Sequence, residues 1–592
     1  MTQVLSLPPV PRAVPALVVR PDAIRTFAAD LLAASAQVDD LGSFVAGSAR
    51  IGDWQGVAST AYHQAIRPIG RLADAMSLAL RHVARRTDQH ADAMQRLLER
   101  RWTLVDERAH LLGTIEAIGA RAAGAPRAAA DALQAACDDC ALRVRRFEVD
   151  LDTWVTDVIA EEEAMRAAFA CVLGLDQIET RYAGVEDPAD AALGAAPAAG
   201  ASPAEVGAWW AGLTRAEQRG IIAASPGSIG NRDGIPPDAR DAANTLALDR
   251  DLAEWGHLEE RGLLAADEER WLENARAARD ACRAIEQGID PIDREPIPSQ
   301  LYLYDPTAFD GDGAVAVCAG DLATADNVAV VVPGFGTDGA SAGYHGERVL
   351  TLYEASRTLD GSQRNASLFW IGYDAPDNVP WDEGWDAAGV IGEDLATRGG
   401  ERLADTIDGL RAAREGEPAH LTVIGHSYGS TTLGHGAHDA GLAADDLVLV
   451  GSPGAGGGAD SAADLGVDRG HVWAGANSRD PVTRLGNHGW WHLESALGGS
   501  GLGDDPAEDA FGARRFEAES TTRADNDGFE GLGDHSKYFD HDTESLYNLS
   551  LVVNGRYAAV REAGSVTDPW YTDPQDPEWD REPTSPDTDG RP

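Results

Sequence analysis

Apolar residues recur at helical spacing from about position 21 to about position 175. One stripe consists of Ile24, Phe27, Leu31, Val38 and Leu41, and a second of Ile69, Leu72, Met76, Leu80 and Val83. A Gly-containing turn at Gly52–Gly56 separates the stripes, so the two helices are expected to form an antiparallel hairpin. A third helical region is expected over Arg127–Leu173. The pattern predicts an all-α helical-bundle domain over residues 21–182, preceded by a flexible segment over residues 1–20.

Residues 183–298 combine a linker with a further helical block. Ala, Pro and Gly dominate residues 183–206, a composition typical of linkers. Trp209–Trp210 and the turn-rich run Ser225–Pro236 come next, followed by charged helical sequence to about Glu286. Prolines at positions 291, 296 and 298 then end the helical pattern ahead of the first predicted strand.

The pattern changes at about Ser299, where short β-branched and aromatic runs begin to alternate with helical segments. This alternation predicts a mainly parallel sheet with helices on both faces, and the apolar run Val328–Val332 is typical of a strand buried on both sides. The strands are expected at Gln300–Tyr304, Ala314–Cys318, Asn327–Val332, Ser367–Gly372, Leu421–Gly425, Leu447–Ser452, His471–Ala476 and Arg515–Ser520. The helices are expected at Gly343–Leu359, Trp385–Arg414, Ser430–Ala440 and Asp460–Leu465. We therefore predict a doubly wound α/β domain over residues 299–560.

Composition limits the kinds of partner that the chain is expected to bind and the places in which it is expected to occur. The chain of 592 residues carries a formal net charge of −48, which repels nucleic acid and anionic membranes. Residues 561–592 are rich in Asp, Glu and Pro and are expected to form a disordered acidic tail. No apolar run approaches the ~18 residues of a membrane span, and early prolines with no basic start argue against a secretory signal. We expect a soluble protein that is cytoplasmic or exported without a cleaved signal peptide.

The five cysteines form neither a disulfide framework nor a zinc pattern. Cys137 and Cys140 lie one turn apart in Ala-rich helical sequence, and no second pair follows at zinc spacing. We expect two helix thiols, although they could form a local disulfide in an exported chain. No other set of metal-binding residues stands out, so we expect neither a metal nor a cofactor.

The run Gly425–Gly429 carries the strongest signal for chemistry. Its sequence is G-H-S-Y-G, and it lies directly behind a predicted strand and ahead of a predicted helix. A serine at such a sharp turn presents its hydroxyl above the sheet, and the flanking glycines leave room for the turn. The N-terminus of the following helix favours negative charge that develops near the serine. Ser427 is thus the candidate nucleophile, and an ordinary strand-to-helix loop is the alternative.

Two later residues stand where the partners of a serine nucleophile are expected. Asp480 follows the predicted strand His471–Ala476 and is the candidate acid, although an Asx turn before Pro481 is a second role for it. His535 follows the last predicted strand and is the candidate general base. Other histidines are weaker candidates, two because they flank a Trp-rich loop and one because it approaches the final helix: His488, His492 and His541.

Backbone N–H groups near the serine complete the candidate site. An oxyanion hole is expected to combine the N–H of Tyr428 with one from the loop after the strand Asn327–Val332. That loop, Pro333–Asp338, has the sequence P-G-F-G-T-D, and glycine lets its backbone approach a substrate oxygen closely. Phe335 is the first candidate donor and Gly336 the second, and a plain Gly-rich turn is the alternative.

Several motifs of the chain occur together in one family. They are the Trp209–Trp210 block, Pro333–Thr337, Tyr373–Pro376, Gly425–Ser430, Ser452–Gly454 and Asp534–His535. With this set, over about residues 205–545, the chain resembles an actinobacterial α/β-hydrolase family of uncharacterised activity. The resemblance implies an α/β-hydrolase fold and a triad of Ser427, Asp480 and His535, but no substrate. The chain departs from the family in a long insertion, about residues 486–513, that could be a lid or a specificity loop.

The helical region carries a second resemblance. Trp54–Gly56 resembles the W-x-G motif of the small ESX-like proteins that are exported by type VII secretion, and members of the hydrolase family often carry such an N-terminus. Tyr182–Glu186 fits the letters of the associated export signal but lies far from the hairpin. The alternative role for Trp54 is to pack a helical turn.

These features predict a serine hydrolase of the esterase or lipase type. It would cleave a small acyl ester or thioester through an acyl-enzyme on Ser427, with His535 as base and Asp480 as the orienting acid. The same residues would serve an acyltransferase if the pocket excluded water. The second hypothesis is a type VII secretion-linked effector or interaction protein, in which the helical N-terminus carries the main role and binds a secretion partner.

Overall fold

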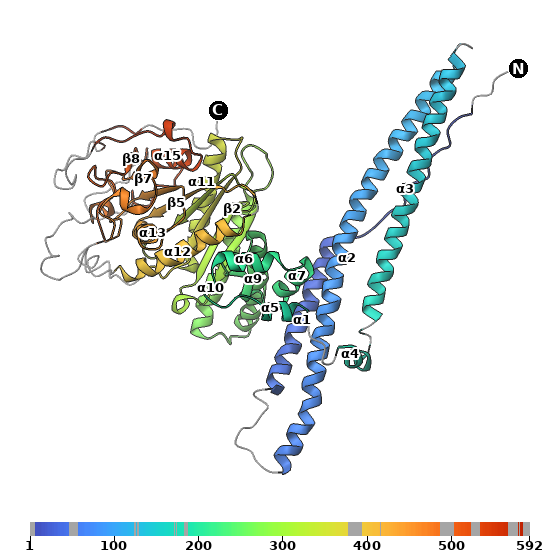
Figure 1. Ribbon diagram of the computed structural model, residues 1–592, viewed down its shortest axis with the longest axis horizontal. Coiled ribbons are helices and arrows are strands. Elements are labelled where there is room, and N and C mark those ends of the chain that lie inside the picture. The colour runs from blue at the N-terminus through green and yellow to red at the C-terminus, as the bar shows by residue number, and fades with distance from the viewer. Residues whose placement is uncertain are drawn as a thin grey trace. The chain divides into compact units, whose positions relative to one another are not determined.

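The computed structural model of the chain (Figure 1) describes most of the sequence. The described residues are 6–46, 57–123, 126, 129–170, 172, 174–182, 188–376, 393–414, 416–456, 458–485, 502–521, 533–565, 578 and 581–583. Several features singled out above lie outside them: Trp54–Gly56, residues 183–186 of the second motif, His488, His492 and residues 486–501 of the insertion.

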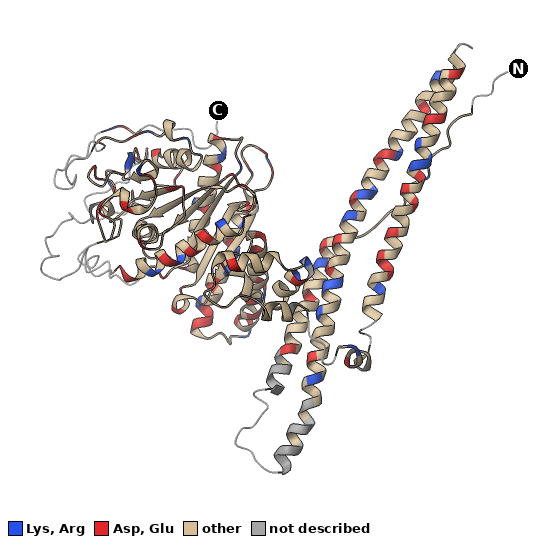
Figure 2. Cartoon of the chain, viewed as in Figure 1, with Lys and Arg blue, Asp and Glu red and all other residues tan. Residues whose placement is uncertain are grey.

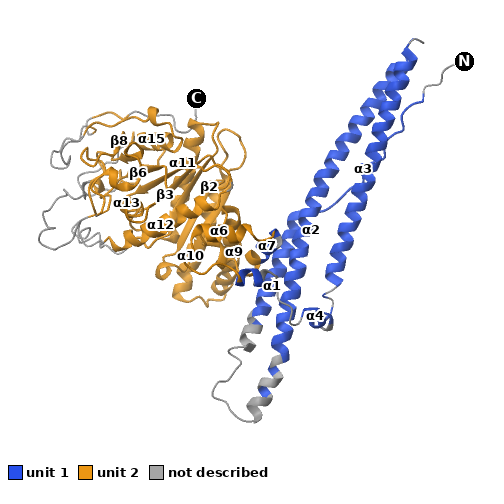
Figure 3. Cartoon of the chain, in the orientation of Figure 1, with its two compact units in different colours: residues 1–194, 215–220 blue, residues 195–214, 221–592 orange. Residues whose placement is uncertain are grey.

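Contacts divide the chain into two compact units (Figure 3). Unit 1 comprises residues 1–194 and 215–220, and unit 2 comprises residues 195–214 and 221–592. The expected linker is thus divided between the units. The helical block that follows it shares a unit with the sheet, except for residues 215–220, which belong to unit 1.

Unit 1 is built from long amphipathic helices. They are α1 (Pro21–Ala46), α2 (Val57–Ala123), α3 (Ala130–Ala170), α4 (Leu175–Tyr182) and α5 (Pro188–Gly194). Arg25 lies 3.2 Å from Asp92 and Arg81 lies 3.4 Å from Asp39, so α1 and α2 run antiparallel, as the hairpin pattern predicts. Leu104 of α2 packs with buried α3 side chains, including Phe147 and Trp154.

The proline-rich segment 6–20, which we expected to be flexible, runs beside α2 and α3. Arg12 makes ion pairs with Glu148 and Asp152 of α3. From α2, Arg101 donates a hydrogen bond of 2.7 Å to the Pro15 carbonyl oxygen, and Arg108 donates one of 2.8 Å to that of Arg12. Extended backbone leaves its carbonyl groups exposed, and the arginines satisfy them.

Cys137 and Cys140 occupy the buried face of α3. Both are free thiols, and both pack with Ile118 of α2. The prediction of two helix thiols one turn apart is confirmed.

Unit 2 contains a mixed, mainly parallel sheet of eight strands (Figure 1). The strands are β1 (Ser299–Asp305), β2 (Ala314–Gly320), β3 (Asn327–Val332), β4 (Asn365–Ile371), β5 (His420–His426), β6 (Asp446–Val450), β7 (Val472–Gly475) and β8 (Arg514–Phe516). Their order is β1-β2-β4-β3-β5-β6-β7-β8. β2 is antiparallel to both β1 and β4, and every pair from β4 to β8 is parallel. Seven of the predicted strands are confirmed with small shifts at their ends, whereas the prediction at Arg515–Ser520 shares only Arg515 and Phe516 with β8.

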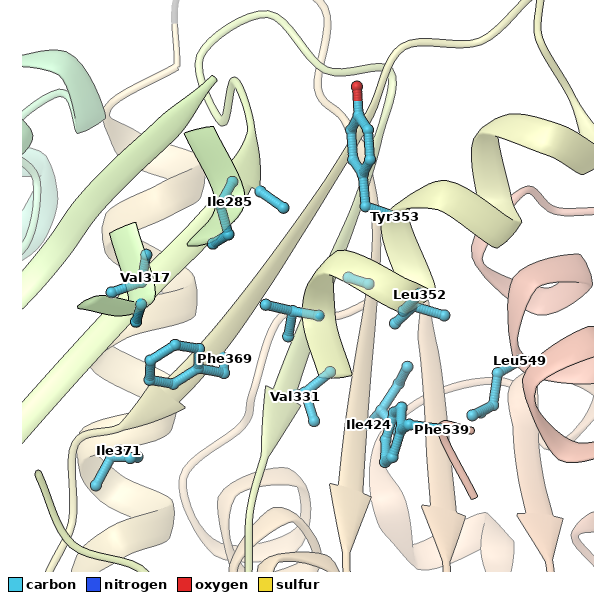
Figure 4. Close-up of a cluster of buried hydrophobic side chains, with 14 of the residues drawn as sticks. Ile285, Val317, Val331, Leu352, Tyr353, Phe369, Ile371, Ile424, Phe539 and Leu549 are labelled. Atoms are coloured by element: carbon cyan, nitrogen blue, oxygen red, sulfur yellow. The ribbon is translucent and has the colours of Figure 1, made fainter. Parts of the chain in front are cut away.

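Helices cover both faces of this sheet, as the apolar strands require. α10 (Ala266–Gln287), α11 (Ala342–Leu359) and α15 (Glu544–Val553) share one buried cluster with the strands, part of which is shown in Figure 4. α12 (Asp394–Ala412) and α13 (Tyr428–Asp439) share the cluster on the other face. The predicted helix Asp460–Leu465 is only a short 3-10 turn over Ala462–Leu465. Residues 385–392 of the predicted helix before β5 lie outside the described residues.

Side chains from the helical segment ahead of the sheet pair with the edge strand β1. Its helices are α6 (Pro203–Ala211), α7 (Arg215–Ala224), α8 (Gly227–Gly230) and α9 (Pro237–Glu260). The Asn231 side chain pairs with both the N–H and the carbonyl oxygen of Tyr304, at 2.9 and 2.7 Å. Buried Arg240 donates to the Tyr302 carbonyl oxygen at 2.9 Å and lies 3.8 Å from the centre of the Tyr302 ring. These side chains satisfy backbone groups that an open sheet edge would expose.

The chain after α15 returns to the sheet at the start of the segment 561–592, which was expected to be a disordered tail. Ala563 N–H donates to the Arg515 carbonyl oxygen at 3.1 Å, and Arg561 N–H donates to Asn548 at 2.9 Å. Farther along, Arg581 pairs with buried Glu544. Part of the segment that was expected to be disordered therefore makes hydrogen bonds and ion pairs within unit 2, to which it belongs.

Acidic and basic side chains are interspersed along both units (Figure 2). Among the described residues, no helix is both long enough and apolar enough to cross a bilayer.

Buried Asp446 gathers hydrogen-bond donors at the amino ends of the parallel strands. His420 Nε2, Tyr557 OH and Trp473 Nε1 lie 2.7, 2.6 and 2.9 Å from its oxygens. The other ring nitrogen of His420 lies 3.0 Å from the Val553 carbonyl oxygen, so both nitrogens face acceptors and the charged form of the ring can donate to both. Burial opposes this charge, but the hydrogen bond and charge of Asp446 outweigh it and raise the pKa of His420.

His420→Gln should lower stability mainly at acidic to neutral pH. A histidine with a raised folded-state pKa stabilises the fold below its unfolded pKa of about 6.5, and this contribution is lost as pH rises through the folded pKa. The variant should lose about 1–2 kcal/mol of unfolding free energy at pH 6 and less at pH 9. Calorimetric unfolding at the two pH values measures the difference. A deficit that increases with pH would contradict this assignment.

Candidate active site

Ser427 stands at the turn between β5 and α13, with backbone angles of φ 57° and ψ −134°. Residues other than glycine rarely adopt a positive φ, and the surrounding structure has to hold it in place. Ser427 N–H donates to the Val450 carbonyl oxygen at 3.0 Å. Ser430 donates to the Ser427 carbonyl oxygen from both its N–H, at 2.9 Å, and its hydroxyl, at 2.6 Å. These bonds fix the strained turn that the sequence predicts.

The two glycines of the turn allow close backbone contacts. A Cβ on Gly425 would lie 2.5 Å from the Ser430 Cα, and one on Gly429 would lie 2.2 Å from the Val332 carbonyl oxygen. Any larger residue at either position would therefore displace backbone. The expected need for space at these glycines is confirmed.

Asp480 and His535 meet beyond the carboxyl ends of the strands. His535 Nδ1 lies 2.8 Å from Asp480 Oδ2, and Asp480 is completely buried. Because an ionised carboxylate only accepts hydrogen bonds, the contact fits a His535 tautomer with its proton on Nδ1. Val482 N–H donates to Asp480 Oδ1 at 2.8 Å, so the Asx turn around Pro481 coexists with the contact to His535.

Two contacts bring this pair to the serine turn. The ring of His426, next to Ser427, stacks on the ring of His535 with centroids 4.8 Å apart. Gly451 follows Val450, the partner of Ser427 N–H, and a Cβ on it would lie 3.1 Å from both Asp480 Oδ2 and His535 Cε1. The Ser427 hydroxyl makes no hydrogen bond within the described residues. The three candidate residues thus share one end of the sheet, and the serine–histidine bond itself belongs to the proposal below.

His426 and Arg348 support the histidine loop, residues 533–540 around His535, and neither residue was assigned a role from the sequence. His426 Nε2 donates to the His535 carbonyl oxygen at 2.9 Å, and burial lowers the pKa of His426 well below its usual range. Arg348 of α11 donates to the Ser536 carbonyl oxygen and stacks against Phe539, with 5.4 Å from its guanidinium carbon to the ring centre. Phe539 is one of the buried side chains labelled in Figure 4. No motif signals these roles, because each depends on residues far apart in sequence.

The competing histidine His541 has an exposed side chain, in contrast to His535. Among the described residues, no group of three or more His, Cys, Asp or Glu side chains is arranged to hold a metal ion.

The loop after β3 packs directly on the serine turn. A Cβ on Gly334 would lie 2.7 Å from the Ser427 Cβ and 2.8 Å from the Tyr428 nitrogen. Gly336 N–H already donates to the Pro376 carbonyl oxygen at 2.8 Å. The N–H of Gly336 is thus already used within the described residues, and the oxyanion roles of Phe335 and of Tyr428, the first residue of α13, stay predictions.

A family comparison agrees with the fold of the sheet domain. Residues 308–488 match the sequence profile of the family described as alpha/beta hydrolase. The C-terminal region contains an alpha/beta hydrolase domain. The matched segment includes Ser427 and Asp480 and ends before His535, whose placement comes from the structure alone.

Proteins similar to this chain occur in mycobacteria. The uncharacterized protein Rv2079 of Mycobacterium tuberculosis is 33% identical over 401 residues, which cover 63% of this chain and 58% of the relative. The uncharacterized protein Rv0963c of the same species is 31% identical over 186 residues, which cover 30% of this chain and 64% of the relative. The chain therefore spans less than two thirds of the length of these relatives.

A solved structure, the esterase LipW from Mycobacterium marinum, matches 36% of this chain and 71% of its own. Its sequence identity is 15% and its TM-score is 0.20, too low to support an argument about function.

Gly334→Ala should damage the hydrolase domain at the serine turn. The added methyl would be pressed against Ser427 and the Tyr428 nitrogen, where backbone has to shift. We expect a loss of about 1–3 kcal/mol of unfolding free energy and, in addition, a large loss of any activity that needs Ser427. Thermal unfolding and an ester-hydrolysis assay measure the two effects.

Gly343→Ala is the matched control, because a Cβ on Gly343 meets nothing within 4 Å. Gly343 lies in the first turn of α11, so alanine should leave stability unchanged or slightly raised. Equal behaviour of the two variants would contradict the close packing of Gly334 on the turn.

Proposed function

We propose that the hydrolase domain cleaves a carboxylic ester or thioester through an acyl-enzyme on Ser427. The observation that carries the proposal is the 2.8 Å hydrogen bond between Asp480 and His535, at the end of the sheet where Ser427 occupies a strained turn. A buried carboxylate that orients a neutral imidazole beside a serine turn is the arrangement that activates a weak nucleophile. The family match supports a hydrolase, and the ester specificity and the roles below are our inference.

In the first step, Ser427 Oγ attacks the acyl carbon while His535 Nε2 accepts the hydroxyl proton. Asp480 keeps the proton on Nδ1 and stabilises the imidazolium that forms. The substrate oxygen becomes negative, and the N–H groups of Tyr428 and Phe335 stabilise it at the positive end of α13.

In the second step, the tetrahedral intermediate expels the alcohol or thiol, which takes the proton from His535. The acyl group remains on Ser427. Water then attacks the acyl carbon with His535 again as base, and the acid leaves as Ser427 regains its proton. Transfer to another alcohol instead of water would make the same residues an acyltransferase.

A series of p-nitrophenyl esters of graded acyl length tests the proposal on the full chain. We expect saturable release of nitrophenol from at least one ester, with kcat in the range of about 1–10³ s⁻¹ that is usual for enzymes. Release no faster than in buffer for every acyl length and for a matching thioester series, by a chain shown to be folded, would overturn it.

The hypothesis of a type VII secretion-linked role stays a prediction. Its motif, Trp54–Gly56, lies outside the described residues. Unit 1 contributes a long helical hairpin, and that architecture alone identifies no partner.

A further inference from the structure

Tyr538 makes a second hydrogen bond to the oxygen of Asp480 that His535 uses. Its hydroxyl donates to Asp480 Oδ2 at 2.7 Å, and His535 Nδ1 lies 2.8 Å from the same atom. The phenol oxygen in turn accepts the N–H of Asn477 at 2.9 Å. Tyr538 is 1% exposed, so water does not compete for these bonds.

The Tyr538 phenol keeps its proton, so it donates a hydrogen bond to the same carboxylate oxygen that His535 contacts. Burial, together with the charge of Asp480, raises the pKa of Tyr538 far above its usual range. Asp480 Oδ1 accepts the Val482 N–H, so the buried carboxylate has three donors. A carboxylate that is hydrogen-bonded by several groups has less negative charge to offer to any one of them.

We propose that Tyr538 is a positioning residue that weakens the pairing of Asp480 with protonated His535 and so sets the pH at which His535 can act as base. The proposal rests on the proposed hydrolase function. A stronger pairing would hold the proton on His535 after the first step and require a higher pH to restore the free base. By occupying Oδ2, Tyr538 keeps the histidine oriented and still able to release its proton.

Other titratable and charged groups surround this pair and remain when the hydroxyl is removed. They are Glu519 after β8, His426 on β5, His345 and Arg348 on α11, and Asp534, Lys537 and Asp540 on the histidine loop. Burial lowers the pKa of His345 to about 3 and that of His426 well below its usual range. The pKa of both rings is therefore lowered below that of an ordinary histidine, which sets them apart from His535 in a titration.

Tyr538→Phe in the full chain tests the proposal, because phenylalanine keeps the ring and removes only the hydroxyl. Two quantities are measured: the midpoint of the acidic limb of kcat/KM, and the midpoint of the His535 ring in an NMR titration of histidine-labelled protein. His535→Gln assigns the resonance. Both midpoints should move to higher pH by about 0.5–1 unit, the size expected for one hydrogen bond to a charged group.

Tyr557→Phe is the matched control. Tyr557 also donates to a buried carboxylate that pairs with a histidine, at 2.6 Å to Asp446, but at the amino ends of the strands. This variant should lose stability and leave both midpoints in place. A shift equal to that of Tyr538→Phe would show a general effect of stability and overturn the proposal.

The NMR midpoint separates failure of this proposal from failure of the hydrolase function. An unchanged His535 midpoint in folded Tyr538→Phe overturns the role of Tyr538, whatever the activity. A shifted midpoint in a chain whose wild type hydrolyses no ester supports the link from Tyr538 to His535 and overturns the hydrolase function.

A chain that does not fold without the hydroxyl can be tested with 3-fluorotyrosine in place of all tyrosines. The fluorinated phenol is a stronger donor, so the His535 midpoint should move to lower pH. No movement, or movement to higher pH, would overturn the proposal.

Discussion

Ser427→Ala should reduce kcat/KM for ester hydrolysis by about 10⁴–10⁶-fold while the chain remains folded. The variant removes the one oxygen that can form the acyl-enzyme and leaves the backbone N–H groups near it intact. The residual rate would come from water attack on an ester held near the oxyanion donors. Steady-state hydrolysis of the best p-nitrophenyl ester measures the loss.

Ser461→Ala is the matched control for this loss. Ser461 belongs to the same unit, and its hydroxyl bonds to Asp464 at 2.8 Å in an exposed turn. Its replacement should change neither kcat nor stability. A Ser427→Ala enzyme with more than a tenth of the wild-type kcat/KM would exclude Ser427 as the nucleophile.

Asp480→Asn should produce the second large effect, a fall in kcat of about 10⁴-fold. The amide keeps the shape of the carboxylate but loses its charge. It would also favour the His535 tautomer with the proton on Nε2, because an amide NH₂ group at Nδ1 needs an acceptor there. The Ser427 hydroxyl would then face an N–H group and have no base. Hydrolysis rates with a chain confirmed as folded by circular dichroism check this expectation.

Asp446→Asn is the control for Asp480→Asn, because it removes a buried carboxylate charge away from the candidate active site. Asp446 is as deeply buried as Asp480 and accepts a similar set of donors, at the opposite end of the strands. Assayed below its unfolding temperature, this variant should keep most of its kcat. A drop as large as that of Asp480→Asn would mean that both changes act through stability.

The strands could be predicted from the sequence, and so could the end of the sheet at which the candidate catalytic residues lie. β-branched runs such as Asn327–Val332 have few alternatives to burial between helices, so their positions follow from composition. Loops at the carboxyl ends of parallel strands meet at one edge, so Ser427 and Asp480 could be assigned together. The order β1-β2-β4-β3 could not be derived, because strand pairing is non-local and two antiparallel strands at the edge leave no local signal.

The fine structure of the site depends on contacts that no motif encodes. Tyr538 reaches Asp480 across 58 positions, and His426 reaches the His535 carbonyl across 109. The second oxyanion candidate, Gly336, donates its N–H to the Pro376 carbonyl oxygen. This contact depends on the path of the chain after β4, which the sequence does not reveal. By contrast, the run Ser225–Pro236 stood out in the sequence, and the structure shows its Asn231 pairing with edge strand β1.

Labelling of the folded chain with a fluorophosphonate, followed by mass spectrometry of its peptides, tests the central claim most directly. The account predicts one added phosphonyl group, located on the peptide that contains Ser427, and no labelling of Ser427→Ala. An unlabelled wild-type chain, or an adduct that forms equally in Ser427→Ala, would contradict it.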